Sequence, residues 1–364
     1  MLRLLAALAS DVDSHVILGE DGPLVAEIRA LGVECEVLPM AERLREVRKD
    51  TVAPSRLDPR PLLSLGSYVL HLRRRLRQLQ PNILHTNSLK AAIYGGVAGR
   101  LAGVPVLWHV RDRIADDYLP RPAVTMVRAL ARVLPTAVVA NSASTLKTLP
   151  KARNAAVRYD PVVPDIIPPH GPRPEREDDT LRVGVVGRLA PWKGQHVFLD
   201  AFARAFPSGD TQACLIGSAM FGEEAYEEQL RGQVERLGLQ ARVQFRGFRT
   251  DVPSELDRLD VLVHCSTSPE PFGQVVVEGM AAGLPVIAAA AGGPTEIITD
   301  GVDGFLTPPG DPDALAAALT RLADQPALRR EVGVVARESA RRYNPTAACE
   351  RLMAVYIAIG NGHR

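Results

Sequence analysis

An apolar run, a turn rich in proline and glycine and a helix-forming segment follow one another in the C-terminal half. This order limits the possible folds most strongly. Val261-Leu262-Val263 predicts a buried strand, and the Ala-rich segment ending at Gly283 predicts a helix. Between them, Ser268 to Gly273 contains two prolines and a glycine. The first helical N–H groups, near Phe272 to Gln274, therefore have no intrahelical partners and can bind an anion. The segment predicts an α/β protein with an anion site beside a strand.

Two glutamates flank this anion site. Glu270 precedes the predicted helix and Glu278 lies inside it. Eight helical steps of about 1.5 Å would separate them by roughly 12 Å. The two carboxylates of a glycoside hydrolase lie only about 5 to 9.5 Å apart, so a hydrolase pair is excluded. The spacing fits one extended ligand with hydroxyls at both ends and phosphates between them, which is the shape of a nucleotide-sugar.

The length of 364 residues predicts two domains. Apolar strand-like runs alternate with helical patterns in both halves, which predicts parallel sheets in two Rossmann-like domains facing each other across a cleft. We expect an N-terminal domain over 1–163, a linker over 164–180 rich in proline and charge, and a C-terminal domain over 181–344. The closing segment 345–364 contains a predicted helix.

Expected strands in the first domain cover 15–18, 33–38, 82–85, 104–109 and 137–140, and those in the second cover 182–186, 213–216, 243–245, 261–263 and 285–288. A helix over 62–79 has leucines at helical spacing and carries Arg73, Arg74, Arg75 and Arg77 on its other side. Such a helix either packs on a sheet with its arginines in water or lies on anionic lipid.

The net charge of +1 conceals an asymmetry. Residues 1–160 contain 23 Lys and Arg against 15 Asp and Glu, whereas the remainder contains 20 against 27. The basic half indicates either an anionic partner, such as a phosphorylated acceptor or a membrane surface, or a solvated arginine-rich surface. We expect no nucleic-acid partner.

Cysteine usage and hydropathy indicate a cytoplasmic protein. The four cysteines are scattered and form no C-x-x-C pair, so neither a disulfide framework nor a zinc site is expected. No run approaches the roughly 20 apolar residues of a membrane span. The apolar stretch after Met1 is shorter than the core of a signal peptide, which predicts a protein that is not exported.

Polar residues close several predicted strands of the first domain. His85, His109 and Asn141 stand at such ends, where open α/β sheets bind their ligands. We favour a functional role for His109, because Arg111 and Asp112 follow it in a polar loop. His85 is better explained as a structural residue that forms hydrogen bonds.

A second cationic turn opens the C-terminal domain. Gly187-Arg188 and Lys193-Gly194 follow the strand 182–186, and the two cations stand at its carboxyl end. Fixed cations at this position could neutralise a diphosphate leaving group without a metal. Arg and Lys side chains in a loop are usually just solvated, so this turn alone is a weak indication of phosphate binding. Together with the glutamate pair in the same half, the indication becomes strong.

These segments together resemble the retaining GT-B glycosyltransferases of family 4, often called glycosyl transferases group 1. The matching stretches are Gly187-Arg188 with Lys193-Gly194, Glu270-Pro271-Phe272-Gly273 with Glu278, Ala282 to Ile287, and Gly292 to Ile297. The similarity covers nearly the whole chain and is sharper in its C-terminal half. It also implies that the closing helix crosses back onto the N-terminal domain.

The resemblance implies a role for each matching residue. Arg188 and Lys193 with Gly187 would hold the donor diphosphate, Glu278 the ribose, and Glu270 the transferred sugar. The residues implied besides these are Phe272, Gly273 and Gln274 at the helix start, Phe248 and Arg249 in the base-binding segment, and His109 near the sugar.

The implied reaction is transfer of a sugar to an acceptor hydroxyl with retention of configuration. The family needs no divalent metal, and no cofactor is expected beyond the donor, for which a UDP-sugar is expected. The acceptor would be anionic, lipid-linked or a glycan, with peripheral membrane contact through the basic domain; a small natural product is a further option. Two alternatives remain open: a nucleotide-sugar epimerase of the same fold and a non-catalytic nucleotide-sugar-binding protein. An NAD-dependent oxidoreductase is disfavoured, because no strand leads into G-x-G-x-x-G.

The sequence departs from the family pattern at its start. Family members open with a strand and a glycine-rich loop before the first helix, whereas Met1 falls at about that helix. We therefore expect the first strand and the loop to be missing from the N-terminal domain, through a late start codon or a truncation.

Overall fold

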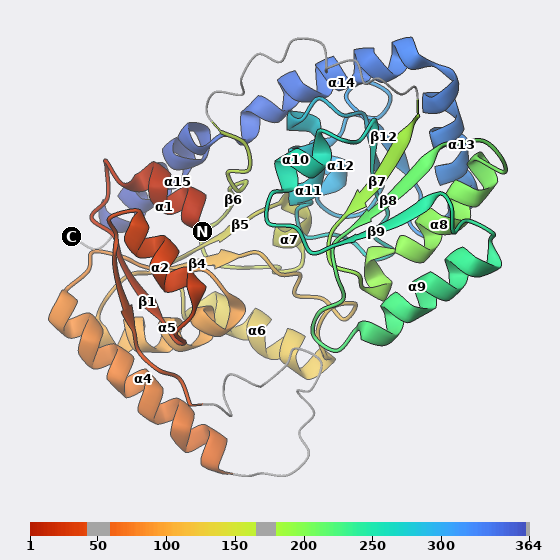
Figure 1. Ribbon diagram of the computed structural model, residues 1–364. Helices are drawn as coiled ribbons and strands as arrows, with labels where there is room; N and C mark the ends of the chain where they lie inside the picture. Colours follow the sequence, from red (N-terminus) through yellow and green to blue (C-terminus); the bar gives the residue numbers. More distant parts are fainter. Residues whose placement is uncertain (42–58, 165–179, 362–364) are drawn as a thin grey trace. The chain divides into compact units, whose positions relative to one another are not determined.

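The chain forms two compact units. The computed structural model describes residues 1–41, 59–164 and 180–361 (Figure 1). One unit comprises Met1–Pro161 with Pro345–Arg364, and the other comprises Val162–Asn344. Apart from its two ends, the predicted linker 164–180 lies outside the described residues.

The second unit contains a six-stranded parallel sheet in the order β12-β11-β10-β7-β8-β9. Its strands are β7 (Arg182–Val186), β8 (Gln212–Ile216), β9 (Val243–Gly247), β10 (Val261–His264), β11 (Val286–Ala289) and β12 (Phe305–Thr307). Its helices are α8 (Gln195–Ala205), α9 (Glu224–Arg236), α10 (Val252–Leu256), α11 (Gln274–Ala281), α12 (Pro294–Ile297), α13 (Pro312–Asp324) and α14 (Pro326–Ala340).

Helices cover both faces of this sheet, which explains why its central strands β7, β10 and β11 are mainly apolar. Val183 and Val185 of β7 share a core with residues of α8, α9 and α13. On the opposite face, α11 lies close to β10 because Gly279 has no side chain. A Cβ atom there would lie 2.2 Å from Cδ2 of Leu262. The carboxyl edge of the sheet is thus the open edge where loops gather.

The first unit contains two parallel sheets. One pairs β1 (His15–Leu18) with β2 (Glu34–Val37), and the other has the order β3-β4-β5-β6. The strands of the second sheet are β3 (Leu84–Thr86), β4 (Val106–Val110), β5 (Ala137–Ala140) and β6 (Ala155–Val157). The helices are α1 (Leu2–Leu8), α2 (Pro23–Ala30), α4 (Pro59–Leu79), α5 (Leu89–Ala102), α6 (Arg121–Val133), α7 (Ala143–Lys147) and α15 (Pro345–Asn361).

Alternate residues of β4 belong to different cores. Trp108 and Val110 pack with residues of α5 and α6, whereas Leu107 packs with residues of α1 and α15. The last helix of the chain therefore covers a sheet that belongs to the first half of the sequence. The expected lack of a strand and a glycine-rich loop before α1 stays a prediction.

The basic helix α4 packs against α5, and most of its arginines have protein partners. Arg73 donates through Nε to the Leu101 carbonyl at 3.1 Å, and Arg77 contacts the same oxygen at 3.5 Å. Arg75 forms an ion pair with Glu36, with Nε 2.8 Å from Oε1. These contacts favour the packed-helix interpretation for three of the four arginines. In the described part of the chain, no helix has the length and apolarity needed to cross a membrane.

Candidate active site

Lys193 stands where the turn after β7 meets the end of β10. It closes a short 3-10 turn, Pro191–Lys193, just before α8. Gly194 follows with a φ of +73°, and a Cβ atom there would lie 1.9 Å from the Cys265 carbonyl oxygen. Glycine alone combines the left-handed conformation with such a close approach. The glycine after Lys193 is therefore explained by the close approach of its backbone to that of Cys265.

The Lys193 ammonium donates to the Glu270 carboxylate, with Nζ 2.7 Å from Oε2. The Ser266 hydroxyl donates to the same oxygen at 3.1 Å, and Nε2 of His264 lies 3.4 Å from it. The Lys193 and Glu270 side chains are only 19% and 13% exposed. Two residues with separately predicted roles thus form one compact, mostly buried cluster.

The cluster keeps Glu270 ionised. Burial alone raises the pKa of Glu270, but the hydrogen bond from His264 and the charge of Lys193 outweigh burial and lower the pKa from 4.5 to about 2. Glu270 is therefore a carboxylate at any ordinary assay pH, able to accept hydrogen bonds from sugar hydroxyls.

The lowered pKa predicts an acid-sensitive step in stability. A carboxyl whose pKa falls on folding contributes stability that is present above its unfolded pKa, near 4.5, and is lost as the pH falls toward 2. The shift corresponds to about 3 kcal/mol between pH 6 and pH 2. We expect urea midpoints measured from pH 6 to pH 3 to fall less steeply in Glu270→Gln than in the unmodified protein. Parallel slopes for the two proteins would contradict the assignment.

A glycine pair after β11 supports the loop that carries Glu270. The Gly293 N–H donates to the Glu270 carbonyl at 2.8 Å. A Cβ atom at Gly292 would lie 2.1 Å from that carbonyl oxygen, and one at Gly293 would lie 2.0 Å from the Phe272 carbonyl oxygen. The Phe272 ring is buried against Tyr343, with centroids 5.7 Å apart. The loop therefore lies between the glycine turn and an aromatic contact.

The helix that follows Glu270 begins at Gln274, whereas the predicted separation of the two glutamates counted every step from Glu270 as helical. α11 runs from Gln274 to Ala281, and Gly273 caps it with a φ of +99°. Only the last four of the eight steps from Glu270 to Glu278 are therefore helical, so the assumption of eight helical steps behind the predicted separation is wrong. Within the helix, Nε2 of Gln274 donates to Oε1 of Glu278 at 2.8 Å. The role of the N-terminal amides of α11 as an anion site stays a prediction.

The remaining residues predicted to bind the donor stand at the carboxyl ends of β7 and β9. Gly187 and Arg188 directly follow β7, and Phe248 and Arg249 directly follow β9. The Phe248 ring is 66% exposed. Arg249 contacts Glu255, with Nε 3.5 Å from Oε1. β7, β8 and β9 are parallel neighbours, so all four residues lie at the same carboxyl edge of the sheet.

His109 does not stand at a strand end as predicted. It is the fourth of the five residues of β4 and is only 4% exposed. Nδ1 of His109 lies 3.1 Å from Nε2 of His85, and Nδ1 of His85 lies 2.6 Å from the Tyr356 hydroxyl. Burial, the Arg111 charge and His85 lower the pKa of His109 well below 6.5, so the ring is neutral. Its approach to the sugar stays a prediction.

His264 and Ser266 were not among the predicted site residues. His264 ends β10 and Ser266 follows two residues later, and both are buried beside the Glu270 carboxylate. The signal was available, because polar residues follow the apolar run Val261-Leu262-Val263 as they follow the strands of the first unit.

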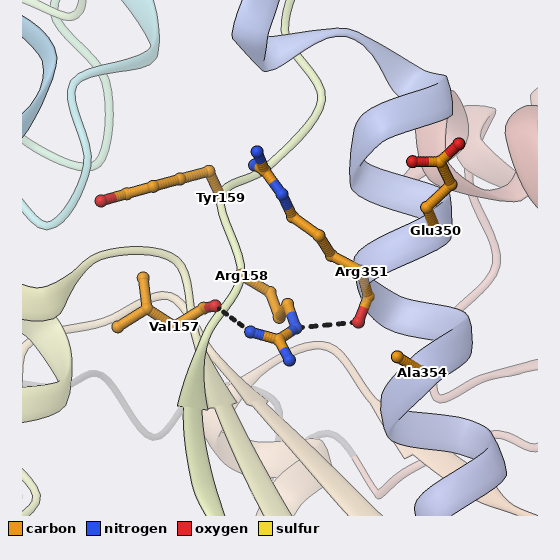
Figure 2. Close-up of a pocket in the computed structure, with 6 residues that line it drawn as sticks. All are labelled: Val157, Arg158, Tyr159, Glu350, Arg351 and Ala354. Atoms are coloured by element: carbon orange, nitrogen blue, oxygen red, sulfur yellow. Dashed lines mark hydrogen bonds between the residues drawn. The ribbon is translucent and has the colours of Figure 1, made fainter.

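A cavity of about 460 Å³ lies in the first unit, between the end of β6 and α15 (Figure 2). Arg158 donates to the Arg351 carbonyl at 2.8 Å and to the Val157 carbonyl at 2.7 Å. The Arg158 guanidinium thereby joins the strand end to the helix. None of the six residues that line the cavity is among the predicted site residues, so it does not define the site.

The carboxyl edge of the six-stranded sheet gathers the groups that a diphosphate requires. Arg188 and Lys193 supply positive charge, and the N-terminus of α11 adds backbone N–H groups. Among the described residues, no group of three His, Cys, Asp or Glu side chains is placed to hold a metal ion.

Two family comparisons cover almost the whole chain. The family described as Glycosyl transferases group 1 matches residues 171–339, and the family described as Glycosyltransferase Family 4 matches residues 1–162. The first range contains the six-stranded sheet, and the second contains both sheets of the first unit.

Individual relatives extend this result. A GDP-mannose-dependent alpha-mannosyltransferase of Mycobacterium tuberculosis (strain CDC 1551 / Oshkosh) is 29% identical over 88% of this chain and 84% of its own length. A D-inositol 3-phosphate glycosyltransferase of Corynebacterium glutamicum (strain R) is 34% identical over 49% of this chain and 43% of its own. The solved structure of Anabaena HepE in complex with UDP-glucose has a TM-score of 0.83 and 27% identity, covering 98% of this chain and 95% of that one.

Site geometry and similarity lead to the same conclusion. The similar proteins are named glycosyltransferases, and the fold and the expected family are confirmed. The chain belongs to glycosyltransferase family 4 and is a glycosyltransferase with the GT-B fold.

Proposed function

We propose that this enzyme transfers a hexosyl group from a nucleoside-diphosphate sugar to an acceptor hydroxyl, with retention of configuration and without a divalent metal. The observation that supports the proposal is the contact between Lys193 and Glu270, because an ammonium suited to a phosphate lies beside a carboxylate suited to sugar hydroxyls. An ammonium has three N–H donors, so Lys193 can keep its bond to Glu270 while it donates to a phosphate oxygen.

In the proposed reaction, Arg188 and Lys193 stabilise the charge that develops on the departing diphosphate. The acceptor hydroxyl attacks from the face that the diphosphate leaves, and no residue is nominated as a covalent nucleophile. Glu270 holds sugar hydroxyls, Glu278 holds the ribose, and His109 approaches the sugar as a neutral imidazole.

A donor panel tests the proposal. UDP-, GDP-, ADP- and dTDP-sugars are each added to the protein, and the shift in Tm is measured. A ligand present at 100 times its Kd stabilises the native state by about 2.7 kcal/mol, so the true donor should raise Tm clearly. We expect a UDP-sugar to do so, as the HepE complex suggests, although the named mannosyltransferase makes GDP-mannose the main competitor. No shift with any of the four would refute nucleotide-sugar binding.

For the acceptor, we propose an anionic or lipid-linked molecule that the basic first unit meets at the cytoplasmic membrane surface. On α4, Leu70 and Arg74 are exposed one helical turn apart, and Leu70 is 56% exposed. Leu101 of the adjoining α5 is 50% exposed. Exposed apolar and basic side chains together suit contact with anionic lipid.

A further inference from the structure

The loop between β8 and α9 (residues 217–223) lies directly beside Arg188. The Leu189 N–H donates to the Ser218 carbonyl at 3.0 Å, so the loop is hydrogen-bonded to the residue after Arg188. The buried Gln195 donates through Nε2 to the Arg188 carbonyl at 2.9 Å. The backbone of Arg188 is therefore held in place before any ligand binds.

The same loop holds the Arg188 side chain. Its Nε lies 3.3 Å from Oε2 of Glu223, and its guanidinium carbon lies 5.1 Å from the centroid of the Phe221 ring. The Nε contact is on the stem side of the guanidinium. It therefore does not compete for the Nη1–Nη2 edge, which forms paired contacts with phosphate oxygens.

Phe221 adopts a backbone conformation that a bulky residue rarely takes. Its φ is +63°, and among the described residues of the second unit no other non-glycine residue has a positive φ. The residue is nevertheless 64% exposed, so core packing does not account for the strain. Strained residues that persist without a packing reason are typical of functional sites. In this conformation the Phe221 ring lies against the Arg188 guanidinium.

We propose that Phe221 and Glu223 are positioning residues, which hold the Arg188 guanidinium at the carboxyl end of β7 for the diphosphate of the donor. The inference rests on the proposed function, because it assigns the diphosphate to Arg188. Phe221 supplies an aromatic face for the cation, and Glu223 fixes the rotation of the guanidinium plane.

The test measures the Kd of UDP and of GDP by calorimetry, together with Tm, for a set of variants. Arg188→Ala should weaken binding of the preferred nucleotide about 10- to 100-fold. Phe221→Leu, which keeps an apolar side chain but loses the aromatic face, should weaken it about three- to fivefold, and Phe221→Tyr should restore it. Phe221→Gly should weaken binding without lowering Tm, because it relieves the positive φ. Lys151→Gly relieves a φ of +65° in the first unit and should leave Kd unchanged.

A double-mutant cycle separates positioning from direct contact. In the Arg188→Ala background, Phe221→Leu should have no further effect on Kd, since Phe221 acts through Arg188. The positioning role would be refuted, and the diphosphate assignment left standing, by either of two results. One is that Phe221→Leu still weakens binding in the Arg188→Ala background. The other is that Phe221→Leu and Phe221→Gly leave Kd unchanged while Arg188→Ala is impaired. Normal nucleotide binding by Arg188→Ala, or none by the unmodified protein, would overturn the diphosphate assignment and the inference with it.

Discussion

Lys193→Met is expected to lower kcat/KM by about 100- to 1,000-fold, the range seen when one group that stabilises transition-state charge is removed. The ammonium is proposed to meet the diphosphate as negative charge develops on it. The structure adds a second effect, because the variant leaves the mostly buried Glu270 carboxylate without its cation. The free energy of unfolding should therefore fall by about 1–3 kcal/mol. Steady-state kinetics with the donor chosen by the panel, together with urea unfolding, measure the two effects.

The double variant Lys193→Met with Glu270→Gln separates these effects. It removes both charges and leaves no unpaired carboxylate, so stability should recover toward that of the unmodified protein. Activity should not recover, because the diphosphate still lacks its cation. Near-normal kcat/KM in the single variant, or activity that returns together with stability, would refute the catalytic role of Lys193.

Gly293→Ala is expected to damage the site through steric overlap alone. The backbone of Gly293 is helical, so alanine fits the local conformation, but its Cβ atom would lie 2.0 Å from the Phe272 carbonyl oxygen. The Phe272 backbone, which belongs to the loop of Glu270, must therefore shift. Overpacking of this kind costs about 1–3 kcal/mol of stability. Because small displacements in an active site have large effects on rate, kcat/KM should fall by about tenfold or more.

Gly66→Ala is the matched control for this substitution. Gly66 lies within helix α4, and a Cβ atom there would meet no atom within 4 Å. Alanine should stabilise this position by about 0.5–1 kcal/mol and leave kinetics unchanged. If Gly293→Ala behaved like Gly66→Ala in both assays, the proposed support of the Glu270 loop would be wrong.

Much of the fold was predictable because parallel strands covered on both faces are mainly apolar. The expected strand 182–186 coincides with β7, and 261–263 lies within β10. The two strands that escaped prediction, β6 and β12, have only three residues each. Runs of that length, such as Ala155-Ala156-Val157, are defined by pairing with a neighbouring strand, and this is a non-local property.

The positions of the site residues were also predictable in part, because cations and polar residues follow apolar runs directly. The pairing of Lys193 with Glu270 was not predictable, since 77 residues separate them and only the adjacency of β7 and β10 brings them together. The burial of His109 was missed because the end of β4 was placed one residue too early. The role of Gly292 and Gly293 depends on a close approach of backbones, which no local pattern records.

A crystal structure of the complex with UDP, or with GDP if the panel selects it, tests the central claim most directly. The account predicts that the diphosphate contacts the Arg188 guanidinium and the Lys193 ammonium, with the N-terminus of α11 beside it and Glu278 at the ribose. A diphosphate bound away from Arg188 and Lys193, with the Lys193–Glu270 pair untouched, would contradict it.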